Sequence, residues 1–123
     1  MRNRTRDFAL RVLKLVRFLP NRMEGWVVGK QLLRSATSVA ANYRATNLAR
    51  SRAEFFAKLC IVVEESDETL FWLELICDAG LLSKDHADEL DATITEASQL
   101  IRIFSSARKS VKTNTSQNNQ MTK

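Results

Sequence analysis

The chain has 123 residues, of which 45% are hydrophobic while only 3 are Gly and 1 is Pro, so we expect one domain built from long helices rather than from strands and turns. The formal charge is +5, and no run of residues reaches the roughly 18 apolar positions that span a bilayer. Arg11, Lys14 and Arg17 interrupt any apolar segment near the N-terminus, which argues against a secretory signal and predicts a cytoplasmic protein.

The charge is unevenly distributed along the chain. Residues 1–62 contain 13 Lys/Arg against 3 Asp/Glu, a net charge of +10, whereas residues 63–123 contain 6 against 11, a net charge of −5. Such a division is typical of a protein that binds a polyanion, or of one whose copies pair head to tail. The alternative is that the two halves only neutralise each other within the fold.

Two helices are predicted in the first half of the chain, and a short turn at Pro20 makes them antiparallel neighbours. The first helix should have its N-cap at Thr5 and should bury one stripe of side chains: Phe8, Val12, Leu15, Val16 and Leu19. The second should run from about Met23 to about Leu48 and should bury a stripe at spacings of 4, 4, 3 and 4: Val28, Leu32, Ala36, Val39 and Tyr43.

Several residues are unusual for the interior of this second helix. Gly25 and Gly29 weaken its first turns, each by about 1 kcal/mol relative to Ala. Trp26 falls outside the core stripe, near the basic side of the helix. It is either a partly covered surface aromatic or a residue that stacks on a ligand or lies in an interface. Asn42 lies in a strip of small polar residues, where we expect a buried amide that bonds across the bundle in preference to a ligand contact.

The third helix opens on a capping box, Ser51-Arg52-Ala53-Glu54, and should end at Gly80 in the left-handed conformation. Its core stripe follows a heptad suited to packing in a bundle: Leu59, Val63, Ser66, Leu70, Leu73 and Cys77. Cys60 and Cys77 are about 25 Å apart along this helix, so they cannot bond to each other and are expected to be small core residues.

The same helix carries apolar residues roughly opposite this stripe. A helix that is apolar on two sides is either central in its fold or covered by another chain, and a four-helix bundle has no central helix. We therefore expect a subunit interface here, against the alternative of an irregular surface, formed by Ile61, Glu64, Glu68, Trp72 and Leu75.

The fourth helix should follow Ser83 as its N-cap and bury a stripe at spacings of 3, 4, 3, 4 and 3: Ala87, Leu90, Ile94, Ala97, Ile101 and Phe104. The predicted fold class is therefore all-α, an antiparallel up-down-up-down four-helix bundle over residues 1–110. Residues 111–123 have almost no apolar side chains and are expected to form a disordered tail.

The sequence offers little for catalysis or for a cofactor. His86 is the only histidine, so neither a zinc site nor a nucleophile–base pair is expected, and no Gly-rich phosphate loop is present. The densest acidic cluster, in the third helix, lacks the Glu-x-x-His pairs of di-metal bundles. We expect no enzymatic activity, no metal and no cofactor. Glu64 or Glu68 should instead form an ion pair with Arg34 or Arg44, within or between subunits.

Basic residues that point away from the core stripes of the first two helices, or follow at the next turn, are the strongest functional signal. Such a set neutralises phosphates without reading a base sequence, although few aromatic residues interleave with it for base stacking. The predicted nucleic-acid-binding residues are Arg11, Lys14, Arg17, Lys30, Arg34, Arg44, Arg50 and Arg52.

Three stretches of the sequence carry a resemblance: QLLRSATSVAANYRA at residues 31–45, SRAEF at 51–55 and EESDETLFWLEL at 64–75. They resemble the bacterial four-helix-bundle proteins found in intervening sequences of 23S rRNA genes, also labelled a ribosomal protein family, and the resemblance covers residues 5–108. It implies a four-helix bundle assembled as a ring-shaped homopentamer, by similarity to the accessory variability proteins of diversity-generating retroelements. Those proteins bind nucleic acid and a reverse transcriptase through basic surface.

The resemblance places Arg34 and Arg44 at positions that are commonly basic or polar in the family. The chain departs from the family where many members have Asn-Ile-x-Glu-Gly, because it has Asn42-Tyr43-Arg44-Ala45-Thr46 there. Overall we expect a non-enzymatic homo-oligomer that binds RNA or DNA without sequence preference, RNA being favoured, as an accessory to an RNA-processing or reverse-transcription partner. The alternative is an oligomeric adaptor that binds a protein partner without nucleic acid.

Overall fold

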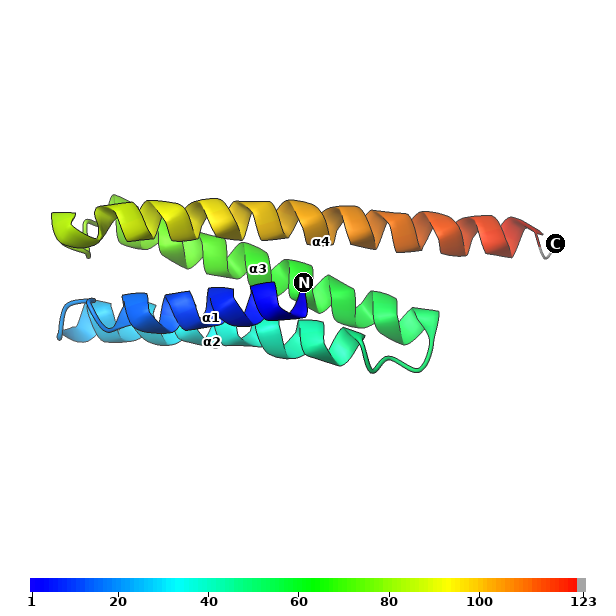
Figure 1. The fold of residues 1–123 in the computed structure, drawn as a ribbon, viewed down its shortest axis with the longest axis horizontal. Helices are drawn as coiled ribbons and strands as arrows, with labels where there is room; N and C mark the ends of the chain where they lie inside the picture. Colours follow the sequence, from blue (N-terminus) through cyan, green and yellow to red (C-terminus); the bar gives the residue numbers. More distant parts are fainter. Residues whose placement is uncertain (122–123) are drawn as a thin grey trace.

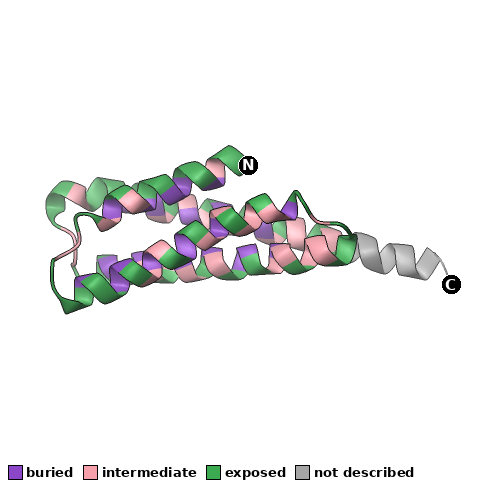
Figure 2. Cartoon of the chain, turned by 90° about the horizontal axis from the view of Figure 1, so that it is seen from below, coloured by how far each residue is buried: buried purple, intermediate pink, exposed green. Residues whose placement is uncertain are grey.

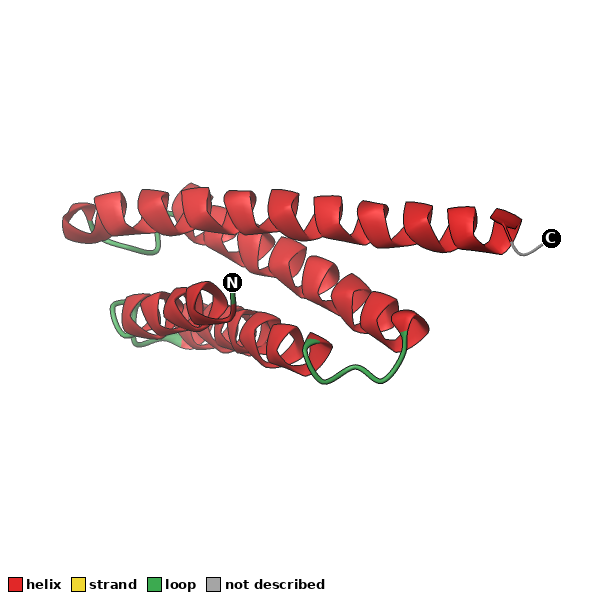
Figure 3. Ribbon diagram, turned by 45° about the vertical axis from the view of Figure 1, so that its right-hand side comes forward, coloured by secondary structure: helices red, strands yellow, loops and turns green. Residues whose placement is uncertain are grey.

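The computed structural model describes the backbone of residues 1–121 and the side chains of residues 1–112. Its helices are, in order, α1 (Arg2–Val16), α2 (Met23–Thr46), α3 (Arg52–Asp78), the short 3-10 helix η1 (Lys84–His86) and α4 (Ala87–Met121). Within the described part of the chain there is no strand (Figure 3). The predicted all-α class is therefore confirmed. α4 continues past residue 110, and the side chains of residues 113–123 lie outside the described residues, so the expected tail at 111–123 stays a prediction.

The helices form an antiparallel bundle in which each long helix packs against the next one along the chain (Figure 1). α1 also contacts α4, and Arg4 links the two through hydrogen bonds of 2.9 and 2.6 Å to the carboxylate of Glu96. These hydrogen bonds hold the pKa of the Glu96 carboxyl below its usual value, against the opposing effect of partial burial. α1 is the shortest of the four long helices, so the N-terminus lies partway along the bundle (Figure 1).

Each long helix turns one stripe of side chains toward the axis of the bundle (Figure 2). Leu32 and Val39 of α2 are fully covered, and Phe104 of α4 packs against Tyr43 with the ring centroids 5.5 Å apart. Burying one such large side chain contributes about 1.5–3 kcal/mol. The predicted stripes of α1 and α2 are confirmed, because every member is buried or half-buried.

The predicted stripes of α3 and α4 were each wrong at one end. Cys77 is exposed, and Ile76 occupies the core position beside it. Ala87 is also exposed, whereas Thr93 and Leu100, outside the predicted stripe, are fully buried. The physical reason is that a straight helix drifts by about 20° per heptad, so a strict alternation of 3 and 4 leaves the core face toward the ends.

Two predicted N-caps were wrong. α1 begins at Arg2, and Thr5 is buried inside the helix, where its hydroxyl donates to the carbonyl oxygen of Arg2 at 2.9 Å. Ser83 precedes η1 but makes no capping hydrogen bond through its side chain. Because the chain first turns into a 3-10 helix, the expected start of α4 moves to Ala87.

The caps of α3 agree with the sequence. The Ser51 hydroxyl accepts a hydrogen bond from the Glu54 backbone N–H at 3.1 Å. At the other end Gly80 has φ of 64°, the left-handed conformation that glycine adopts without steric cost. This conformation lets the Leu81 N–H donate to the Ile76 carbonyl at 3.1 Å, which satisfies an acceptor left free at the helix end.

The polar groups of the core are satisfied mainly inside single helices. Six buried hydroxyls donate to a carbonyl one turn earlier in their own helix: Thr5, Ser35, Thr46, Ser66, Thr69 and Thr93. The Thr69 hydroxyl also lies 2.9 Å from Ser35 Oγ, so its single proton is donated either to the Glu65 carbonyl or across to Ser35, and this contact joins α2 to α3. Among the described side chains, no buried polar atom lacks a hydrogen-bond partner.

Asn42 does not bond across the bundle, so that prediction was wrong. The side chain is half-buried, and its amide lies 2.9 Å from both the carbonyl oxygen and the hydroxyl of Ser38 in the same helix. A residue four positions earlier is within reach of a short amide side chain, and this local contact satisfies the donor without a partner on another helix.

The turn between α1 and α2 depends on a close approach of the backbone at Gly25. A Cβ added at this residue would lie 1.9 Å from the carbonyl oxygen of Pro20. At Gly29 an added Cβ would meet only side-chain methyl groups, 3.1 Å away on Leu19 and 3.3 Å away on Val16. Gly25, which weakens the helix by propensity, is therefore the residue that lets the turn pack onto α2.

Candidate nucleic-acid interface

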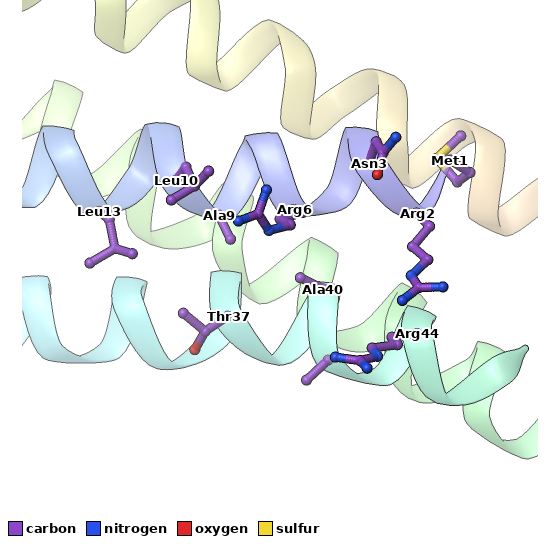
Figure 4. Close-up of a pocket in the computed structure, with 11 residues that line it drawn as sticks. Met1, Arg2, Asn3, Arg6, Ala9, Leu10, Leu13, Thr37, Ala40 and Arg44 are labelled. Atoms are coloured by element: carbon purple, nitrogen blue, oxygen red, sulfur yellow. The ribbon is translucent and has the colours of Figure 1, made fainter. Parts of the chain in front are cut away.

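A groove of about 850 Å³ runs between α1 and the second half of α2. Three arginines, one asparagine and several small or apolar side chains line it: Met1, Arg2, Asn3, Arg6, Ala9, Leu10 and Leu13 from the N-terminus and α1, and Thr37, Ala40, Ala41 and Arg44 on α2. Arg2 extends from α1 toward α2, where Arg44 lies, and Arg6 is one turn further along α1 (Figure 4). The groove therefore combines guanidinium groups with an apolar floor.

Helical spacing continues the same side of both helices beyond the groove, toward the α1–α2 turn. Arg17 follows the groove residue Leu13 by four positions, and on α2 three further side chains precede Thr37 at spacings of 4, 3 and 4, so each set shares one side of its helix. We call this surface the α1–α2 trough. It comprises Arg2, Arg6, Leu10, Leu13 and Arg17 on the α1 side, and Trp26, Lys30, Leu33, Thr37, Ala41 and Arg44 on α2. At ~1.5 Å per residue, its α1 side is about 22 Å long.

The cations of the trough form no ion pair with any other described residue. Neither side of the trough contains Asp or Glu, and the two nearest carboxylates in sequence point elsewhere. Asp7 lines a separate pocket beside Arg11, and Glu24 pairs with Arg22. Like charges held together without counter-ions raise the local positive potential, and such a surface attracts polyanions.

Three of the eight predicted basic residues lie in the trough: Arg17, Lys30 and Arg44. Arg50 and Arg52 lie apart from it, around a pocket of about 430 Å³ at the start of α3 that Phe55 also lines. All eight predicted residues are exposed, but they do not form one continuous surface. The reason is that a residue can point away from the core in several directions, which the spacing along one helix does not distinguish.

Arg11 and Lys14 face the opposite flank of α1, toward α4. Arg11 Nε lies 3.2 Å from Glu89 Oε1, so its charge is partly neutralised there. His86 lines the same pocket and stacks on Phe18 with the ring centroids 3.9 Å apart. The part of the chain with described side chains contains no group of three or more His, Cys, Asp or Glu that could hold a metal ion.

Arg34 is occupied by carboxylates of α3. Its Nη1 lies 3.2 Å from Glu65 Oε2, and its Nη2 hydrogen-bonds to Glu68. The hydrogen bond from Arg34 holds the pKa of the Glu68 carboxyl below its usual value, in spite of partial burial. The predicted pairing of Glu68 with Arg34 is thus confirmed within one chain. Arg34 is accordingly a weaker candidate for phosphate contacts than the cations of the trough.

Two trough residues, Arg2 and Arg6, were missed from the sequence. With the N-cap placed at Thr5, Arg2 lay outside the expected helix and could not be assigned to a face of it. The signal that could have found them is the spacing of 4 between Arg2, Arg6 and Leu10, which continues the outward stripe of α1 to its first residue.

Three of the five residues predicted for a subunit interface on α3 are exposed, namely Ile61, Glu64 and Leu75, and Phe71, which was not predicted, is exposed with them. The exposed fractions of Ile61, Phe71 and Leu75 are 40%, 53% and 37%. Glu64 lies exposed among them, and no ion pair joins it to another described residue. Trp72 is only half-exposed, because it also packs against the core. We call Ile61, Glu64, Phe71 and Leu75 the α3 outer stripe.

No helix of the described residues has both the length and the apolar character that would let it cross a bilayer.

Comparison with known proteins identifies relatives of the chain. The family model of the 23S rRNA-intervening sequence protein matches residues 1–103. A similar solved structure is that of a protein with unknown function from the S23 ribosomal protein family of Bacteroides thetaiotaomicron. It is 32% identical, with a TM-score of 0.78, and the similarity covers 88% of this chain and 97% of that one. No curated protein matches the chain. The family match extends over α1, α2, α3 and about the first half of α4, and the chain belongs to the 23S rRNA-intervening sequence protein family.

Proposed function

We propose that the protein is a non-enzymatic RNA-binding protein whose α1–α2 trough holds the phosphate backbone. The observation that carries the proposal is the set of exposed cations along the trough, none of which pairs with a carboxylate of the described residues. RNA is the first ligand to test because the family takes its name from intervening sequences of 23S rRNA.

The chemistry of the trough favours phosphates over base edges. A guanidinium group offers planar, paired N–H donors that match phosphate oxygens, and four of the five trough cations are arginines: Arg2, Arg6, Arg17 and Arg44, with Lys30 as the fifth. Besides the cations, the only polar side chains that line the groove are those of Asn3 and Thr37, so few uncharged groups there could read a base edge. Binding should therefore be tolerant of sequence.

The salt dependence of binding tests this proposal directly. A fluorescein-labelled RNA hairpin with a single-stranded overhang is titrated with the protein at increasing salt, and the affinity is read from fluorescence anisotropy. If each trough cation neutralises one phosphate, the slope of log affinity against log salt should be about −3.5 to −4.5. A flat salt response, or no binding at low salt, would contradict the proposal.

We also propose that copies of the protein assemble through the α3 outer stripe, as a pentamer by resemblance to the related accessory proteins. The supporting observation is that this stripe exposes Ile61, Phe71 and Leu75 together on one helix, on the side away from the core. Exposed apolar side chains gathered on one face are typical of a surface that another chain covers. An RNA-processing or reverse-transcription enzyme is the partner class that we propose for the assembled protein.

Shortening the apolar side chains of the α3 outer stripe should dissociate the oligomer. The variant Ile61→Ala/Leu75→Ala is expected to sediment as a monomer, because the buried apolar area that joins the subunits is reduced. A matched variant, Leu48→Ala/Ile103→Ala, removes similar side chains that are 75% and 36% exposed elsewhere and should sediment like the wild type. A wild-type protein that is itself monomeric would refute the interface.

The rival function is an adaptor in which the acidic α3 of one copy occupies the trough of the next. This alternative predicts that the wild-type oligomer does not bind RNA at moderate salt. It also predicts that the monomeric variant Ile61→Ala/Leu75→Ala binds RNA more tightly than the wild type, because its trough is uncovered. Measuring both proteins in the same anisotropy titration separates the two functions.

A further inference from the structure

Trp26 is an exposed aromatic residue that is held in one orientation. The side chain is 61% exposed in the first turn of α2. Its indole N–H donates to the Asn21 carboxamide oxygen at 2.9 Å, which restricts rotation of the ring. An exposed indole with a fixed position loses little conformational entropy when a planar ligand stacks on it.

The indole stands at one end of the trough, beside cations. Lys30 is one helical turn further along the same side of α2, and Arg17 belongs to the same end of the trough on the α1 side. The nearest acidic residue, Glu24, is paired with Arg22. A flat aromatic face next to unpaired positive charge can bind a nucleotide in two ways at once. The base stacks on the indole, and the phosphate interacts with the cations.

We propose that Trp26 stacks on an unpaired nucleobase, so that the protein prefers single-stranded RNA segments to continuous duplex. The proposal rests on the function inferred above, because the strand must lie along the trough for its base to reach the indole. The bases of a continuous duplex stack on each other and are not free to stack on a side chain, whereas the bases of a loop or an end are.

Comparing single-stranded with duplex RNA tests the stacking site. Labelled polyuridine and an RNA duplex of the same length are titrated with wild type, Trp26→Ala and Trp26→Phe. The Trp26→Ala variant should bind polyuridine about fivefold more weakly or worse, while its affinity for the duplex and the salt slope should not change. Trp26→Phe should retain most of the affinity because phenylalanine also offers a ring.

Two controls separate stacking from other effects. Met23, which is 73% exposed in the same turn, gives the matched variant Met23→Ala, which should bind both RNAs like the wild type. In the Trp72→Phe background Trp26 is the only tryptophan, and polyuridine should quench its fluorescence while inorganic polyphosphate, which has no bases, should not.

The outcomes of these titrations are distinct. If Trp26→Ala weakens binding to polyuridine and duplex equally, or weakens neither, stacking is refuted and the phosphate-binding trough stands. If the wild type binds neither RNA at low salt, both the trough and the stacking site are refuted. If the fluorescence emission of Trp26 changes on addition of anionic lipid vesicles but not of polyuridine, the indole contacts a membrane surface and the proposal is overturned.

Discussion

Replacing Arg2, Arg6 and Arg44 by Glu in one chain is expected to lower the affinity for RNA about a thousandfold. A net 1.5–3 kcal/mol is typical of a hydrogen bond to a charged group, and about 1.4 kcal/mol corresponds to a factor of ten, so three lost phosphate contacts account for this change. The fold should survive, because all three side chains are exposed and form no ion pair with a described residue. Anisotropy and far-ultraviolet circular dichroism give the two measurements.

A control with the same change in net charge shows whether the position of the charges matters. Lys84→Glu, Arg102→Glu and Lys112→Glu alter three exposed residues outside the trough. Their combination should weaken RNA binding only slightly at physiological salt, because charges more than about 8 Å from the ligand are screened. Equal losses in the two triple variants would mean that overall charge, and not the trough, binds the RNA.

Gly25→Ala is expected to be the most damaging small substitution for stability, with a loss of about 3 kcal/mol or more in the free energy of unfolding. The added Cβ would lie 1.9 Å from the Pro20 carbonyl oxygen, and a backbone atom in a tight turn cannot rotate away as a side chain can. For a chain of this size, such a loss lowers Tm by about 10 °C. Thermal and urea unfolding followed by circular dichroism measure it.

Gly29→Ala is the matched comparison, one turn further along α2. Its added Cβ would meet the methyl groups of Leu19 and Val16 at 3.1 and 3.3 Å, and these can move by the few tenths of an ångström required. Alanine also favours a helix by about 1 kcal/mol over glycine, so the net change in stability should be small. If the two variants lost the same stability, the contact with Pro20 would not be the cause.

The sequence predicted the helices and the cores of α1 and α2 because apolar spacing along one helix is a local property. Leu32, Ala36 and Val39 are completely covered as their spacing indicated. The ends of the α3 and α4 stripes were not predictable in this way. Whether Cys77 or Ile76 is buried depends on how far the straight helix has drifted from the heptad pattern at its end, and the direction from which the neighbouring helices cover that end is fixed only in the packed bundle.

Only part of the trough was predictable, for a similar reason. The sequence shows that Arg34 and Arg44 point away from the core, but it cannot show which of them meets a carboxylate. In the fold Arg34 lies beside Glu65 and Glu68 of α3, whereas Arg44 faces the groove with Arg2. The difference arises from the antiparallel pairing of helices, which places residues distant in sequence next to each other.

The hydroxyls of the core, bonded within their own helices, have a consequence for which substitutions the bundle tolerates. The buried hydroxyls form their hydrogen bonds within one helix and do not need a partner on another. The contact between Ser35 and Thr69 is the exception among the six. Apart from outer ion pairs such as Arg4 with Glu96, substitutions on the outer faces leave the core contacts in place, and they alter what the bundle binds more readily than how it folds. One bundle architecture can therefore carry different outer surfaces.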